Sequence, residues 1–155
     1  MTNLQKAHFF SIFLGLFVIV FDQASKWSVL AFLERGSVVE VCKYVNIILS
    51  YNLGTSFGLL SPATETQRCL IIVLSVLCIS FLIYVFCKLR VITEKVLCGA
   101  LIGGAISNLI DRFIHGGVVD FVDAHYEGWH WPAFNVADSV ISLSAIFLII
   151  TSLRR

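Results

Sequence analysis

Charged residues are scarce in this sequence: Asp, Glu, Lys and Arg make up only 14% of its 155 residues, whereas 58% are hydrophobic. A soluble domain of this length needs far more polar surface to stay in solution, so the composition excludes that class. The net charge is only +1, which leaves no electrostatic argument for binding nucleic acid or an acidic substrate. The sequence therefore predicts an integral membrane protein without a nucleic-acid partner.

Several motifs of known chemistry are also missing. There is no G-x-S-x-G, no phosphate-cradling glycine loop and no convincing Ser/Lys pair. No internal repeat or linker interrupts the chain, so we expect one domain over residues 1–155. No C-x-x-C pair occurs, which argues against a disulfide framework or a zinc site. We expect the five cysteines to be small buried hydrophobic residues: Cys42, Cys69, Cys78, Cys87 and Cys98.

Long apolar runs predict four membrane-spanning helices, at about residues 7–26, 69–87, 96–111 and 134–153. The sequence FDQASKW follows the first run and is not a small-x-small cleavage site, so we expect a retained helix rather than a cleaved signal peptide. The third run is rich in glycine, which lets neighbouring helices approach closely and predicts a central helix. These glycines are Gly99, Gly103 and Gly104.

Basic residues predict the direction of the four helices. The short connection at residues 88–95 is densely basic, and basic residues concentrate in short cytoplasmic loops. We therefore expect both termini in the cytoplasm and residues 27–68 and 111–133 on the opposite side. The stretch SVVEVCKYVNIILSYN is rich in β-branched residues and predicts short strands there, followed by turns in LGTSFG and SPAT. Amides in the turn at Asn52 and Gly54 are candidates for contact with an extended substrate.

Two carboxylates stand at positions that are unfavourable for a charge in a membrane protein. Asp138 lies about one turn inside the fourth run, with Asn135 on the same helical face, and Asp120 follows a short extended stretch. A carboxylate in hydrocarbon costs about 2.5–3.5 kcal/mol. The connection between the two acids begins and ends at one membrane surface. We therefore expect Asp120 and Asp138 to meet in one small volume there.

Two acids held close in a low-dielectric place cannot both ionise comfortably, so one pKa rises and the pair shares a proton near neutrality. One carboxylate can then take a proton from water while the other polarises or protonates a carbonyl. Asp123 is a rival for the second acid, although we expect it on the more exposed part of the loop. His125 and His130 are rivals as metal ligands, but their spacing matches no zinc pattern, so we expect no metal.

Two further polar groups have structural explanations beside functional ones. Asp22 and Lys26 stand at i, i+4 and favour an ion pair, which spacing alone assigns to the membrane edge without a chemical role. Asn108, Asp111 and Arg112 share one face at the end of the third run. An ion pair at the helix end, with Arg112 reaching the interface, explains them as well as a site does.

With these residues gathered, the chain resembles bacterial lipoprotein signal peptidase (signal peptidase II), an aspartyl protease of the inner membrane. Five motifs carry the resemblance nearly end to end: FDQASK, YNLGTSFG, GGAISNLIDR, VVDF and FNVADS. The resemblance implies an all-α membrane protein, a four-transmembrane-helix bundle with a small periplasmic β-cradle. It also implies that the enzyme removes the signal peptide from diacylglyceryl-modified prolipoproteins just before the lipid-modified cysteine.

By the same resemblance, the catalytic residues are Asp120 and Asp138. The resemblance assigns substrate-binding or supporting roles to Asp22, Lys26, Asn52, Gly54, Gly104, Asn108, Asp111, Arg112 and Asn135. It further implies a monomer among membrane lipids, with cytoplasmic termini and a site at the periplasmic face. Such an enzyme needs no cofactor and binds globomycin-type peptide inhibitors. Thr55-Ser56 and Ser107 depart from the family pattern but remain small, so they concern packing rather than activity.

Two other classes of protein compete with the peptidase. A transporter or proton relay would distribute its acids through the membrane thickness, whereas Asp22, Asp111, Asp120 and Asp138 are expected near one surface. A non-catalytic membrane scaffold would leave the placement of Asp120 and Asp138 unexplained. We therefore expect a site for chemistry at one membrane surface.

Overall fold

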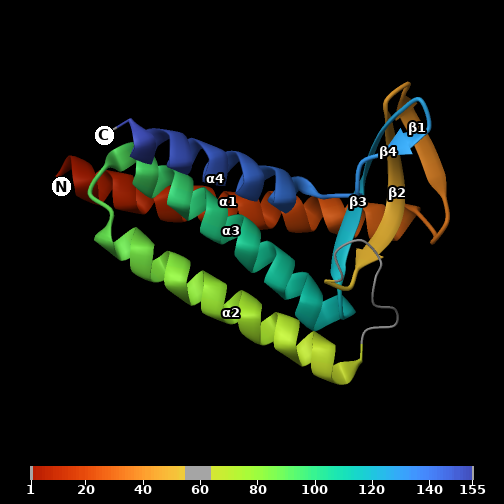
Figure 1. Ribbon diagram of the computed structural model, residues 1–155, viewed down its shortest axis with the longest axis horizontal. Helices are drawn as coiled ribbons and strands as arrows, with labels where there is room; N and C mark the ends of the chain where they lie inside the picture. The colour runs from red at the N-terminus through yellow and green to blue at the C-terminus, as the bar shows by residue number, and fades with distance from the viewer. Residues whose placement is uncertain (1, 55–63, 155) are drawn as a thin grey trace.

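The computed structural model describes residues 2–54 and 64–154. Four helices lie side by side, and a small sheet stands across the end of the bundle that is farther from both termini (Figure 1). All four helices are long and apolar enough to cross a membrane, so the chain is a multi-pass membrane protein. The turns expected in LGTSFG and SPAT, and the Thr55-Ser56 departure, fall largely on residues 55–63, outside the described residues.

Helices α1, α2 and α4 begin at side-chain caps, and several helices extend beyond the apolar runs. Helix α1 (Asn3–Phe32) and helix α2 (Glu65–Lys88) each start with a capping box in which a threonine and a glutamine satisfy the free amides. Helix α3 (Ile92–His115) ends at a glycine in the left-handed region, and helix α4 (Val136–Leu153) starts at Asn135. Because α1 has 30 residues, it is about 45 Å long and exceeds a hydrocarbon layer of about 30 Å.

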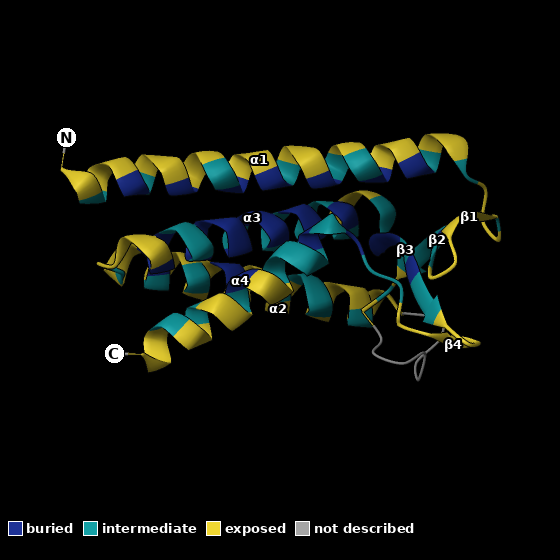
Figure 2. Cartoon of the chain, turned by 90° about the horizontal axis from the view of Figure 1, so that it is seen from above, coloured by how far each residue is buried: buried dark blue, intermediate teal, exposed yellow. Residues whose placement is uncertain are grey.

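Helix α3 is the centre of the bundle, as its glycines predict. It packs against α1, α2 and α4, and half of the residues in its most apolar 18-residue stretch are buried. A Cβ atom added at Gly99 would lie 2.6 Å from the carbonyl oxygen of Ser11 on α1. Only glycine therefore lets α1 and α3 approach this closely, and the dark blue stripes on the facing sides of both helices mark the resulting core (Figure 2).

The expectation for the cysteines is wrong in four of five positions. Cys98 on α3 is buried, whereas the other four are exposed on the protein surface: Cys42, Cys69, Cys78 and Cys87. Three of these exposed thiols lie on α2, which is mostly unburied. A helix that faces lipid needs apolar side chains even where the protein does not cover them, so hydrophobicity alone does not predict burial in a membrane span.

The sheet is antiparallel, and its strand order follows the sequence. Strands β1 (Val38–Cys42) and β2 (Val45–Asn52) confirm the strands expected from the β-branched stretch. Strand β3 (Val118–Tyr126) pairs with β2, and the two-residue strand β4 (Trp129–His130) completes the sheet. Strand β3 follows α3 directly and carries Asp120 opposite Ser50, so the sheet delivers this acid to the end of the bundle.

Candidate active site

Asn135 joins Asp120 of β3 to Asp138 of α4. Its Nδ2 donates to Oδ1 of Asp120 at 2.7 Å, while its Oδ1 accepts the backbone N–H of Asp138 at 2.9 Å. The backbone N–H of Asn135 donates in turn to Oδ2 of Asp138 at 3.3 Å. Asn135 is the N-cap of α4 and is fully buried. The start of this helix and the approach of the two acids therefore depend on the same side chain.

A second amide holds the other oxygen of Asp138. Asn108 of α3 donates from Nδ2 to Oδ1 of Asp138 at 2.8 Å. Asp120 is almost completely buried, and Asp138 is partly buried. Both acids thus have hydrogen-bond partners, and solvent hardly reaches Asp120.

Burial and the negative charge of Asp138 raise the pKa of Asp120 to about 7, although hydrogen bonds from Asn52 and Asn135 partly oppose the shift. Desolvation disfavours the charged carboxylate, and a second carboxylate nearby disfavours it further. Both effects therefore favour the protonated form of Asp120 relative to an exposed aspartate. This is the arrangement expected for two acids that share a proton.

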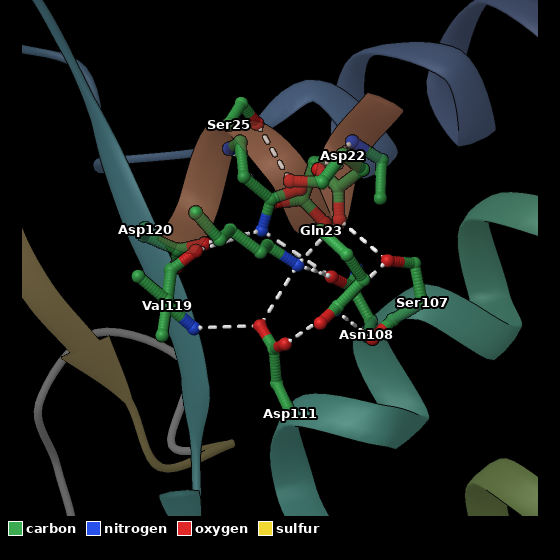
Figure 3. Close-up of polar contacts among 12 residues, drawn as sticks. Asp22, Gln23, Ser25, Ser107, Asn108, Asp111, Val119 and Asp120 are labelled. Atoms are coloured by element: carbon green, nitrogen blue, oxygen red, sulfur yellow. Dashed lines mark hydrogen bonds and ion pairs between the residues drawn. The ribbon is translucent and has the colours of Figure 1, made fainter. Parts of the chain in front are cut away.

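The ammonium group of the buried Lys26 contacts three side-chain oxygen atoms. Nζ of Lys26 lies 2.7 Å from Oδ2 of Asp22, 2.8 Å from Oδ2 of Asp111 and 2.9 Å from Oδ1 of Asn108. Figure 3 shows the side chains of Asp22, Asp111 and Asn108 directed towards this common centre. The ion pair of Asp22 and Lys26 forms as the i, i+4 spacing predicts, but both side chains are fully buried rather than placed at the membrane edge.

Each carboxylate of this cluster also anchors the backbone beside one of the two acids. Oδ2 of Asp111 accepts the N–H of Val119, the residue before Asp120, at 3.0 Å. Oδ1 of Asp22 accepts the N–H of Ala137, the residue before Asp138, at 2.8 Å. Lys26 binds both anchoring carboxylates, so one cation ties together the backbone supports of Asp120 and Asp138.

Two further members of the cluster did not stand out in the sequence as site residues. Nε2 of Gln23 donates to Oδ1 of Asp111 at 2.7 Å and to the hydroxyl and carbonyl oxygens of Ser107. The Ser107 hydroxyl donates to Oδ2 of Asp22 at 2.7 Å. These bonds join α1 to α3 across more than 80 positions of sequence, and spacing along one helix gives no sign of them.

The remaining residues named from the sequence surround the same end of the bundle. Arg112 donates to the carbonyl oxygen of Asn108 at 3.1 Å, whereas the ion pair of Asp111 is with Lys26, so the expected helix-end pair is not the contact that forms. Oδ1 of Asn52 accepts the N–H of Gly54, whose φ of +83° suits glycine. A Cβ added at Gly104 would lie 3.0 Å from the carbonyl oxygen of Ala137, so Gly104 allows α3 and α4 to meet beside the site.

The expected exposure of Asp123 is wrong. Asp123 is 7% exposed, accepts a hydrogen bond from Asn46 at 3.0 Å and lies 2.7 Å from Nδ1 of His130. Burial favours the protonated form, but the hydrogen bonds to His130 and Asn46 outweigh it and hold the pKa of Asp123 below its usual value. Within the described residues no group of three or more His, Cys, Asp or Glu side chains could hold a metal ion. The ring of His125 stacks on that of His130 with centroids 5.1 Å apart.

Comparisons with known proteins agree over nearly the whole chain. A family model described as signal peptidase (SPase) II matches residues 14–154. The chain is 40% identical to the lipoprotein signal peptidase of Polynucleobacter necessarius subsp. necessarius, over 92% of this chain and 88% of that protein. It is 41% identical to that of Paraburkholderia phytofirmans, over 91% and 83%. A solved bacterial membrane enzyme matches with a TM-score of 0.81 at 32% identity, over 93% of this chain and 87% of that one.

Proposed function

The chain belongs to the signal peptidase II family, and on that premise we propose that it is an aspartyl endopeptidase with Asp120 and Asp138 as its catalytic pair. Membership makes the protein a protease that removes signal peptides from lipoproteins. The proposal adds the chemistry of cleavage, the lipid-modified form of the substrate and the residues in each role.

The observation that carries the proposal is the shared support of the two acids. Asn135 bonds to both, at 2.7 Å to Asp120 and 2.9 Å to the backbone of Asp138. The pKa of Asp120 is raised to about 7 by burial and by Asp138. At neutral pH the pair can therefore hold one proton and one negative charge, which a reaction by activated water requires.

In the proposed reaction, the ionised aspartate takes a proton from a water molecule as the water oxygen attacks the carbonyl carbon before the modified cysteine. The protonated aspartate donates a hydrogen bond to the developing oxyanion. The tetrahedral intermediate then collapses, the C–N bond breaks, and a proton passes to the leaving amine. The pair ends with one proton, as it began, so the reaction needs no cofactor.

We further propose that the substrate is a diacylglyceryl prolipoprotein in the bacterial inner membrane. Its acyl chains stay in the bilayer while the scissile peptide meets the acids at headgroup depth. Both termini then lie in the cytoplasm and the sheet lies at the periplasmic face, in accord with the basic connection at residues 88–95. We propose a monomer that globomycin-type peptides inhibit by occupying the same site.

The test is cleavage of a diacylated prolipoprotein by purified enzyme in which Asp120→Asn or Asp138→Asn replaces one acid. An amide keeps the size of the carboxylate but cannot accept the proton of water, so we expect each variant to bind substrate and leave it uncut. Asp123→Asn is the matched control, because residues three apart on a strand point to opposite faces, and it should keep most activity. Normal turnover by Asp138→Asn, or loss of cleavage on chelation, would refute the mechanism.

A further inference from the structure

A cleft beside Asp138 lies between the start of α4 and the segment 131–134, which links β4 to this helix (Figure 1). Its volume is about 630 Å³, within the range of about 300–1,000 Å³ that small-molecule sites have. Trp131 lines it from the linking segment, and Ser142 and Leu143 line it from the helix. The cleft therefore adjoins one of the two acids and is large enough for part of a ligand.

The cleft is open to the surroundings of the bundle. Trp131 and Leu143, which line it, are each 56% exposed. Exposed tryptophans in membrane proteins lie at headgroup depth, and an exposed leucine on a membrane span faces hydrocarbon. A molecule in this cleft therefore meets the polar interface at one end and acyl chains at the other.

Ser142 places an unused hydrogen-bond donor in this cleft. A serine within a helix can donate to the carbonyl oxygen of the preceding turn, as Ser139 does to Asn135 at 3.1 Å. Among the hydrogen bonds of the described residues, none involves the hydroxyl of Ser142, although this residue is exposed on a mostly apolar helix. A hydroxyl without a partner in apolar surroundings is costly. Ser142 is therefore suited to donate to an oxygen atom of a bound molecule.

The spacing of Ser142 and Asp138 fits the structure of a diacylglyceryl cysteine. The two residues share one face of α4 and lie about 6 Å apart along the helix axis. In the modified cysteine, a thioether joins the side chain to one glyceryl carbon, and the next glyceryl carbon carries the first fatty ester. An ester carbonyl can thus lie at Ser142 while the peptide bond before the cysteine lies at Asp138.

We propose that this cleft binds the diacylglyceryl group of the substrate and that the hydroxyl of Ser142 donates to an ester carbonyl of that group. The inference rests on the proposed function, because it takes the substrate from there. The acyl chains then run past Leu143 into the bilayer. Ser142 is a specificity-determining residue that favours ester-linked over ether-linked chains, since an ether keeps the glyceryl backbone but lacks the carbonyl acceptor.

The experiment uses full-length enzyme in micelles of a maltoside detergent. This detergent carries no ester, so a preference for esters comes only from the substrate and not from surrounding lipid. Two synthetic prolipopeptides differ only in their glyceryl linkages, which are esters in one and ethers in the other. For the unmodified enzyme we expect KM for the ester peptide to be about fivefold lower, the equivalent of about 1 kcal/mol, which is the usual net contribution of one hydrogen bond. The kcat should be the same for both, because neither linkage takes part in the bond that breaks.

Enzyme variants decide whether Ser142 is the cause. Ser142→Ala lacks the donor and should cleave both peptides with the same KM. The control Ser80→Ala removes another exposed hydroxyl, which donates to the carbonyl oxygen of Val76 on α2 at 2.8 Å, and should keep the preference of the unmodified enzyme. If the ratio of KM values is the same in the unmodified enzyme and in Ser142→Ala, the inference is wrong although the proposed function stands. If the unmodified enzyme cleaves neither peptide, the proposed function fails and the inference fails with it.

Discussion

Replacement of Lys26 by methionine tests the central ion cluster. Methionine keeps most of the side-chain volume but removes the cation that lies within 2.9 Å of Asp22, Asp111 and Asn108. Asp22 and Asp111 are 0% and 1% exposed, so water cannot replace the lysine. Two buried carboxylates would then face each other without a cation between them, although each would keep its hydrogen-bond donors.

The expected loss of stability is large. Removal of one partner from a buried ion pair costs about 3–5 kcal/mol, because the remaining charge stays buried and uncompensated. The activity should fall as well, because Asp111 and Asp22 hold the backbone of Val119 and Ala137 next to the two acids. A shift in either anchor changes the distance between Asp120 and Asp138, and small misplacements of catalytic groups are costly.

Thermal unfolding in detergent and cleavage of a diacylated prolipopeptide measure the two effects. Lys43→Met, which removes an exposed lysine from the turn between β1 and β2, is the matched control and should change stability by less than about 0.5 kcal/mol. Addition of Asp22→Asn to Lys26→Met should recover part of the stability, because the amide removes one buried charge and still accepts the N–H of Ala137. Near-native stability and turnover of Lys26→Met would refute the role that we assign to the cluster.

Three other predictions concern the pKa of Asp120, the packing of α1 on α3 and the orientation of the protein in the membrane. The pKa of Asp120 is raised from 3.8 to about 7, so its proton stabilises the folded state fully below about pH 4, and this contribution is lost as the pH rises through about 7. The unfolding temperature of Asp120→Asn should therefore depend less on pH than that of the unmodified enzyme. An unchanged pH dependence would contradict the shift. Gly99→Val should lower the unfolding temperature by pushing α1 away from α3, because its Cβ would lie 2.6 Å from the Ser11 carbonyl oxygen. The control Thr93→Val, at an exposed position of the same helix, should leave the unfolding temperature unchanged. Cysteines introduced at Ser37 and Thr93 test the orientation: an impermeant thiol reagent should label position 37 from the outside of intact cells, and labelling of position 93 instead would reverse the proposed topology.

The bundle could be predicted because the signals for it are local. The length of each apolar run predicts a span, and the glycines of the third run predict the central helix. Capping was equally local: Thr2 with Gln5 and Thr64 with Gln67 form a T-x-x-Q pattern that marks where α1 and α2 begin. We expected those helices to begin later because hydropathy alone does not detect the polar first turn.

The candidate site could be predicted only in part, because its contacts join distant segments. The cost of a carboxylate in a membrane pointed to Asp138, and the resemblance supplied the supporting residues. The partner of Asp111 is Lys26, 85 positions away, whereas local spacing suggested Arg112. Asp123 is buried because the register of β3 against β2 places it opposite Asn46, and no pattern within one strand specifies a register.

The cluster around Lys26 and the two acids beside it join segments that are synthesised at different times. Lys26 and Asp22 are made with the first span, Asp111 with the third, Asp120 with the sheet, and Asp138 with the last span. A ribosome that has not yet released α4 into the membrane has produced a chain without the second acid and without Asn135, the residue that joins the pair. On the mechanism that we propose, a nascent chain therefore cannot yet cut peptides, and protease activity begins only when the final helix has docked.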